Sequence, residues 1–201
     1  MRRAKIPNMT ARAFALFATA IGTCAIAWGR RGIVWLQLPQ KDETAARSRA
    51  MRRFPEALET LPPPGVNLAV RDIVSLLAGE PVDLSRIGLD MSDVPEFNRR
   101  VYAVARTIPP GETLTYGEVA ARLGDTGAAR AVGQALGTNP FPIVVPCHRV
   151  LAAHGGTGGF SARGGVDTKM RMLSIERART GSAPSLFDAH GGLPLAVARR
   201  A

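Results

Sequence analysis

Apolar residues recur with two different spacings in the first half of the chain, and the change between them separates predicted strands from predicted helices. Residues 13–39 are mostly apolar and are broken at 22–23 and at 29–32, which predicts two or three strands joined by tight turns. Residues 42–61 carry apolar side chains at roughly helical spacing, and the Pro-Pro-Pro-Gly run at 62–65 is expected to stop this helix.

A second helix and a short strand are predicted before residue 92. The helix is indicated by an apolar face at helical spacing, formed by Val66, Val70, Ile73, Val74 and Leu77. Gly79 is expected to end it, and residues 81–90 favour a return as a short strand. We interpret residues 1–91 as a small α/β domain in which no residue is assigned to chemistry.

Helices dominate the pattern from residue 92 onward. Ser92 or Asp93 is the expected N-cap of a helix that has Pro95 in its first turn and ends at the Pro-Pro-Gly of 109–111. The buried stripe of this helix is predicted to consist of Phe97, Val101, Val104 and Ile108. The helix leads into the segments that carry the candidate chemistry.

The next two helices are short and lie close together. Thr115 and Glu118 have the spacing of a capping box at the start of the first, residues 124–127 form a Gly-containing turn, and 128–137 form the second. This pattern predicts a helix-turn-helix, although helical hairpins are common. The second helix consists largely of Ala and Gly, which suits either a close approach to a narrow surface such as a minor groove or close helix packing.

The C-terminal part contains a glycine-rich segment, a last helix and a tail. The glycine-rich segment, 151–167, either lets its backbone approach a ligand or forms a surface loop. Asp167 or Thr168 is the expected N-cap of the last helix. We interpret residues 92–178 as a second domain and residues 179–201 as a tail without an assigned role.

The charge balance points to a polyanionic partner. The 201 residues include 26 Lys and Arg against 16 Asp and Glu, a formal net charge of +10. Nucleic acid is the first candidate for such a partner and an anionic membrane the second, while a generic basic surface is the alternative. Many of the basic residues are Arg, whose planar guanidinium suits contacts to phosphate.

The N-terminal sequence allows two interpretations. Arg2, Arg3 and Lys5 precede an apolar run over 13–28, a combination that resembles a secretion signal. The Gly-Thr pair at 22–23 interrupts the run, and the whole segment fits a strand, turn, strand unit better. We therefore expect a hairpin.

Two cysteines and three histidines are the candidate nucleophiles and ligands. The cysteines are Cys24 and Cys147, and no Cys-x-x-Cys or other tetrahedral zinc pattern is visible, so no metal site and no cofactor are predicted. A disulfide between the two cysteines stays open at this point. A reactive lone thiol would imply a reducing compartment, and a cytoplasmic location is therefore expected.

The Pro146-Cys147-His148 segment is the strongest chemical candidate. A thiol beside an imidazole can be an activated nucleophile, because the thiolate is the reactive form. Adjacent side chains on an extended segment point to opposite faces, however, and a buried free cysteine next to a structural histidine is the alternative. The dipeptide alone does not decide between these readings.

Taken together, several motifs resemble the O6-alkylguanine-DNA alkyltransferases, also called methylated-DNA–protein-cysteine methyltransferases. The similar stretch covers about residues 94–178. The motifs occur in one order and at close spacing: Tyr116, Ala128-Ala129-Arg130-Ala131-Val132-Gly133, Asn139-Pro140, Pro146-Cys147-His148-Arg149-Val150, the glycine-rich loop and Glu176. The resemblance implies an RNase H-like N-terminal α/β domain followed by a mostly helical, winged-helix-like catalytic domain with a helix-turn-helix.

The resemblance implies DNA repair by direct reversal of alkylation damage. Cys147 would take the alkyl group from guanine O6 in a single turnover, and O4-alkylthymine is a second candidate substrate. His148 would deprotonate Cys147 through a bridging water, and Glu176 would hold the histidine tautomer. Tyr116 would help the guanine leave as a neutral species. No cofactor is implied, and a monomer is the simplest expectation.

The resemblance also implies a DNA-binding surface and a base pocket. Arg130 would enter the duplex from the minor groove where the target nucleotide has rotated out. The expected DNA-binding residues around it are Thr115, Ala128, Ala129, Ala131 and Gly133. Residues expected to line or brace the pocket are Asn139, Pro146, Arg149, Val150 and Ser161.

The chain departs from the family pattern at two places. Tyr102 stands where the family often has Trp, and the segment 160–165 is about two residues longer than expected, which bears on Ser161 and on the alkyl groups that fit. Three alternative functions stay open: a non-catalytic protein that binds alkylated DNA, a helix-turn-helix regulator and a Cys-His hydrolase. A reactive Cys147 argues against the first, and the small-residue helix argues against the second.

Overall fold

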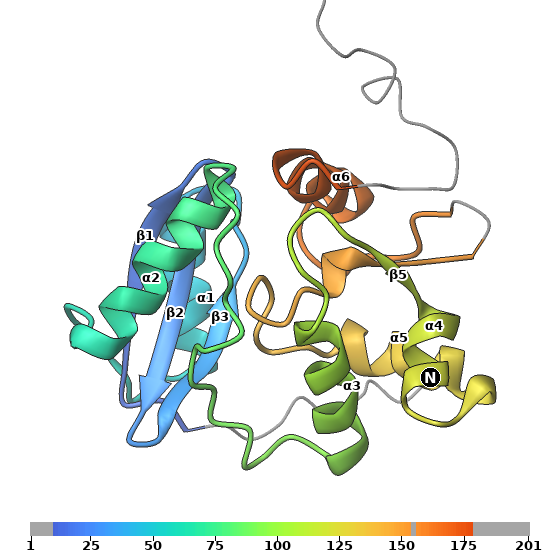
Figure 1. Ribbon diagram of the computed structural model, residues 1–201. Coiled ribbons are helices and arrows are strands. Elements are labelled where there is room, and N and C mark those ends of the chain that lie inside the picture. The colour runs from blue at the N-terminus through green and yellow to red at the C-terminus, as the bar shows by residue number, and fades with distance from the viewer. Residues whose placement is uncertain (1–9, 154–155, 179–201) are drawn as a thin grey trace, which may run out of the picture.

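The computed structural model describes residues 10–153 and 156–178 and has a mixed α/β fold, as the sequence predicted (Figure 1). A four-stranded sheet in the order β3-β2-β1-β4 forms the N-terminal half, with two helices packed against it. Its elements are β1 (Ala13–Thr19), β2 (Gly22–Gly29), β3 (Gly32–Gln37), α1 (Glu43–Arg53), β4 (Leu58–Glu59) and α2 (Pro64–Leu77).

The predicted hairpin over residues 13–39 is confirmed. β1 pairs antiparallel with β2, and β2 pairs antiparallel with β3, while β4 joins the other edge of β1 in parallel. Gly29 and Gly32 close the second turn, where Gly32 has a φ of +133° and its Cα lies so close to Gly88 that an added Cβ would sit 3.1 Å from the carbonyl oxygen. A side chain is therefore disfavoured at this turn.

The first helix is shorter than the sequence indicated. α1 ends at Arg53 rather than near 61, because Pro55 cannot continue the helix and the chain leaves it at Phe54. Two residues assigned to its apolar stripe are exposed, Met51 by 54% and Leu58 by 73%, and Leu58 belongs to β4. The proline run begins α2 instead of only stopping α1, since Pro64 is its first residue.

Other boundaries also differ from the prediction. Residues 81–90 form no named strand, and only an isolated bridge joins Leu89 to Ile33. The helix predicted to start at Ser92 or Asp93 has Pro95 as its N-cap. Its buried residues are Val101, Tyr102 and Ala105, of which only Val101 belongs to the predicted stripe. The last helix has Gly164 as its N-cap rather than Asp167 or Thr168, and the hydroxyl of Thr168 donates to the carbonyl of Arg163.

Short elements connected by loops form the C-terminal half. They are α3 (Glu96–Arg106), β5 (Leu114–Thr115), α4 (Tyr116–Arg122), η1 (Thr126–Ala128), α5 (Ala129–Gly137), η2 (Cys147–Arg149), β6 (Val150–Leu151) and α6 (Gly165–Ile175). The capping box of Thr115 and Glu118 is present at the start of α4. Because α4 and α5 pack against each other, the helix-turn-helix prediction is confirmed.

β3 lies at the side of the N-terminal sheet that faces the C-terminal half (Figure 1), and hydrogen bonds from β3 and α6 join the two halves. The amide of Leu36 donates to the carbonyl of Pro140 at 2.9 Å, and Arg171 of α6 donates to the carbonyl of Ala20 at 2.5 Å. The domain boundary near residue 91 stays a prediction. None of the helices in the described part of the chain is long and apolar enough to cross a bilayer.

Candidate active site

A rigid loop delivers Cys147 to the centre of the C-terminal half. The loop leaves α5 at Asn139, whose side-chain amide donates to the carbonyl of Val145 at 2.9 Å while its oxygen accepts from the amide of Phe141 at 2.8 Å. Ile143 within it has a φ of +77°, a left-handed conformation that a β-branched residue rarely adopts. Asn139 therefore ties both ends of the loop together just before Cys147.

Three buried side chains form a hydrogen-bonded cluster beside Cys147. The Nε2 of His148 lies 3.0 Å from Oε1 of Glu176, the C-cap residue of α6. Arg149 donates from Nε to Oε2 of Glu176 at 2.8 Å and from Nη2 to Oε1 at 2.9 Å. Its Nη1 donates to the carbonyl of Ile108 at 2.6 Å, so the cluster is also anchored to the end of α3.

The electrostatics of the cluster fix its protonation. Burial raises the pKa of Glu176, but hydrogen bonds and charge from His148 and Arg149 outweigh it and lower the pKa to about 2. Burial lowers the pKa of His148 more than Glu176 raises it, so the imidazole is neutral at pH 7. Because an ionised carboxylate only accepts, we assign the imidazole proton to Nε2. The Nδ1 of His148 is then a free acceptor, and it has no hydrogen-bond partner among the described residues.

Cys147 lies where two cavities adjoin. The residue is free and partly buried, and it lines both cavities. Burial raises the pKa of the thiol, while a hydrogen bond with Asn139 and the charge of Lys169 act in the opposite direction. The other cysteine, Cys24, is free as well, and burial raises its pKa to about 12, so it is an unreactive core thiol. The disulfide left open by the sequence is therefore absent.

Lys169 belongs to the site, although the sequence did not suggest it. It is completely buried, and its Nζ donates to the carbonyls of Val150 at 2.7 Å and Thr157 at 2.6 Å. Burial lowers its pKa to about 8, against the attraction of the Cys147 thiolate. The helical spacing could have revealed this burial. Lys169 lies on the same face of α6 as the buried Met172, three residues later, and as Glu176, seven residues later.

A base-sized cavity of about 580 Å³ opens between α4, α5 and the loop after Gly158. Its lining includes five of the residues singled out from the sequence, namely Tyr116, Ala129, Arg130, Gly133 and Ser161, together with Cys147. Burial, followed by the charge of the thiolate, raises the pKa of Tyr116, so its hydroxyl is protonated. Arg130 is exposed at the rim of this cavity.

The remaining predicted residues lie around the cavity rather than in its wall. Thr115 caps α4 and so sets the direction of the helix that begins at Tyr116. Ala128 is buried in η1, and Ala131 is half-buried in α5. Val150 is buried, and its carbonyl binds Lys169. Pro146, Arg149 and Ile108 line a separate hollow on the other side of the cysteine segment.

Two further observations concern ligands and packing. Among residues 10–153 and 156–178, no group of three or more His, Cys, Asp or Glu side chains could hold a metal ion. Tyr102, which replaces the tryptophan often present in the similar family, is buried and donates from its hydroxyl to the carbonyl of Ala135 at 2.9 Å. This bond ties α3 to the second helix of the helix-turn-helix.

The catalytic half matches a known family. A model described as "6-O-methylguanine DNA methyltransferase, DNA binding domain" matches residues 96–178. A methylated-DNA–protein-cysteine methyltransferase of Mycolicibacterium paratuberculosis is 47% identical over 120 residues, which are 60% of this chain and 70% of that protein. The protein of the same name in Mycobacterium bovis is 41% identical over 135 residues, 67% of this chain and 79% of that protein.

Solved structures extend the similarity to the N-terminal half. A crystal structure of Mycobacterium tuberculosis OGT in complex with DNA has a TM-score of 0.66 and 34% identity, and covers 82% of this chain and 92% of that chain. A structure of Mycobacterium tuberculosis O6-methylguanine methyltransferase has a TM-score of 0.66 and 32% identity over 88% of this chain and 99% of its own. The chain therefore belongs to the methylated-DNA–protein-cysteine methyltransferase family.

Proposed function

We propose that the protein repairs duplex DNA by transferring an alkyl group from O6-alkylguanine to the thiol of Cys147. The observation that carries the proposal is the place of this thiol. It lies between a base-sized cavity beside a helix-turn-helix and the buried cluster of His148, Glu176 and Arg149. The family and its DNA complex support DNA as the partner.

His148 acts as the general base. Its Nδ1 is free to accept while Nε2 donates to Glu176, so the proton of Cys147 can pass to Nδ1 through one water molecule. This route also answers the objection that neighbouring side chains point apart. Lys169 stabilises the thiolate electrostatically, which offsets part of the effect of burial on the Cys147 pKa.

The transfer is an in-line displacement at a saturated carbon. An electron pair of the thiolate forms the S–C bond. The C–O6 bond breaks, and the guanine keeps the electron pair of that broken bond. Tyr116, which is half-buried and protonated, donates a hydrogen bond or proton to the departing base. The thioether that results has no good leaving group, so Cys147 is not regenerated and each molecule reacts once.

Arg130 stabilises DNA from which the target nucleotide has rotated out of the duplex. It is exposed beside the cavity, on a helix whose small residues allow a close approach through the minor groove. Filling the space left by the extruded nucleotide offsets an unstacking cost of a few kcal/mol, which is lowest for a poorly paired base such as an alkylated guanine. Because every proposed residue comes from one chain, the protein acts as a monomer. The reduced thiol suits the cytoplasm.

Measuring alkyl transfer directly tests this function. The intact protein is incubated with duplex DNA that carries one O6-methylguanine and is then weighed by mass spectrometry, with Cys147→Ser as the matched variant. We expect a gain of one methyl group per molecule, located on Cys147 and absent from the variant. Lesion binding without a mass gain would instead favour a non-catalytic damage-binding protein.

A further inference from the structure

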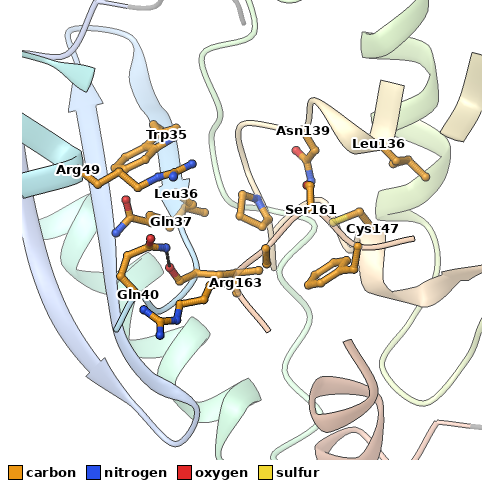
Figure 2. Close-up of a pocket in the computed structure, with 14 residues that line it drawn as sticks. Trp35, Leu36, Gln37, Gln40, Arg49, Leu136, Asn139, Cys147, Ser161 and Arg163 are labelled. Carbon is orange, nitrogen blue, oxygen red and sulfur yellow. Dashed lines mark hydrogen bonds between the residues drawn. The ribbon is translucent and has the colours of Figure 1, made fainter. Parts of the chain in front are cut away.

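A second cavity adjoins Cys147 on the side of the N-terminal sheet (Figure 2). It has a volume of about 330 Å³, and we call it the sheet-side cavity. The N-terminal wall is formed by β3 residues 35–37 and by Arg49 of α1, and the C-terminal wall by the loop that ends at Arg163. Leu136, Phe160 and Ser161 line both this cavity and the base-sized cavity, so the two meet at the reacting sulfur.

The walls of the sheet-side cavity carry polar groups that the fold leaves unused. Arg49 and Arg163 are both exposed, and neither guanidinium has an ion-pair or hydrogen-bond partner in the described part of the chain. Gln37 is 4% exposed and donates to the carbonyl of Ala46, but its Oε1 has no partner among the described residues. An apolar chain in the cavity would leave the buried Gln37 oxygen without a partner, while the two exposed guanidinium groups would keep their contact with water.

We propose that the sheet-side cavity receives the distal part of an O6-alkyl adduct and that Arg49 and Arg163 favour chains ending in a carboxylate. The inference rests on the proposed role of Cys147 as the alkyl acceptor. The thiolate attacks the methylene carbon bonded to O6, the C–O6 bond breaks, and guanine keeps the electron pair and takes a proton. The carboxylate takes no part in the bond changes and ends as the terminus of an S-carboxyalkyl group on Cys147.

The geometry of displacement directs the chain toward this cavity. The substituents of the reacting carbon project sideways from the line that joins sulfur, carbon and oxygen, while the base occupies the cavity next to Tyr116. The sheet-side cavity is the neighbouring space that shares Cys147. A methyl group is too short to enter the sheet-side cavity. A longer chain can approach the guanidinium groups of Arg49 and Arg163, and guanidinium groups bind carboxylates in a bidentate manner.

Arg163 supplies the positive charge on the C-terminal wall of the sheet-side cavity. It lies in the segment 160–165 of the glycine-rich loop and lines the cavity together with Gln40 (Figure 2). Both arginines are exposed to solvent, so each ion pair is screened and modest. We expect a carboxylate to react about fivefold faster than an isosteric neutral amide.

A matched pair of adducts tests the inference. Duplexes carry one O6-(carboxyalkyl)guanine or the corresponding primary amide, at increasing chain lengths, with O6-methylguanine as reference, and mass spectrometry gives the rate constant of transfer to Cys147. The acid-to-amide rate ratio should be about five at low salt and should fall as salt rises. Arg49→Gln and Arg163→Gln should each lower this ratio toward one. Arg52→Gln removes an exposed charge from the same helix outside the cavity and should leave the ratio unchanged.

Each other outcome has a distinct meaning. Methyl transfer with an acid-to-amide ratio of one would overturn the inference and leave the proposed function standing. Equal slowing of every adduct in the Arg49 and Arg163 variants would overturn it as well, because the two arginines would then bind a DNA phosphate. Failure to transfer even a methyl group would refute the proposed function and the inference together. Thermal unfolding of each variant confirms that it is folded.

Discussion

Replacing Glu176 by Gln should weaken His148 as the general base, because it removes the negative charge that lies beside the imidazole. In the wild-type protein, the carboxylate accepts from the Nε2 of His148 and from two nitrogens of Arg149. One amide oxygen cannot replace both carboxylate oxygens, because Oε1 accepts from His148 and from Nη2 of Arg149, while Oε2 accepts from Nε of Arg149. In either orientation, the amide nitrogen of the glutamine would face a donor of Arg149, which only donates. The negative charge that stabilises the imidazolium would also be lost, so His148 would accept the proton of Cys147 less readily.

Two magnitudes follow from the structure. The pKa of Glu176 falls from 4.5 to about 2 on folding. This shift corresponds to about 3 kcal/mol of stability at neutral pH that a neutral glutamine would not supply. A correctly placed general base contributes a factor of about 10²–10⁴ to a rate, so transfer near neutral pH should slow by that amount. Urea unfolding measures the loss of stability and the rate constant of methyl transfer measures the loss of activity, and the reasoning predicts both losses.

The assay is the rate constant of methyl transfer to Cys147 as a function of pH, with urea unfolding for stability. Because burial raises the pKa of Cys147, the variant should regain activity toward alkaline pH, where the thiol ionises without a base. Glu112→Gln removes an exposed carboxylate outside the cluster and should change neither measurement. A folded Glu176→Gln protein with the wild-type rate at neutral pH would refute the assignment of His148 as the base.

Three further predictions concern the surroundings of the thiol. Lys169→Met should move the pH–rate profile to higher pH because the charge of Lys169 lowers the Cys147 pKa, and an unmoved thiolate titration would contradict this. Gly158→Ala should slow methyl transfer by about tenfold, because the residue has a φ of +68° and the added Cβ would lie 2.9 Å from the Tyr116 hydroxyl. An unchanged rate of transfer would show that the loop moves to accommodate the Cβ. Acid should destabilise the protein: Glu176 contributes stability above its unfolded pKa of 4.5 that is lost as pH falls toward about 2, measurable by urea unfolding across that range.

The secondary structure could be predicted where the signal is local. The Gly-bounded turn at 29–32 and the capping box at Thr115 depend on neighbouring residues, and both are present. α1 was predicted too long because Leu58 matches helical spacing, while its exposed position in a parallel edge strand depends on β1, far away in sequence. Spacing alone cannot distinguish an exposed edge residue from the continuation of a helical stripe.

The site was predictable only in part, for a related reason. Motif order identified Cys147 and Glu176, but the two lie on separate elements, and their connection through Arg149 exists only after α6 packs against η2. Arg149 was expected merely to line or brace the pocket, yet it holds both oxygens of Glu176 and reaches Ile108 as well. Partners in the folded protein determine these roles, and residue type alone does not reveal them.

The buried charge of Lys169 offsets part of the effect that burial has on the pKa of Cys147. Arg149 and Glu176 neutralise each other in a direct ion pair. Lys169, by contrast, is completely buried, donates to two carbonyl oxygens and has no carboxylate partner in the described part of the chain. Burial of an ion is unfavourable unless an opposite charge compensates it, and the thiolate of Cys147 is the group that supplies this charge. Ionisation of Cys147 therefore balances the site, while burial alone opposes it. Alkylation removes the negative charge permanently, so the reacted protein should release the proton of Lys169 more readily than the unreacted thiolate form.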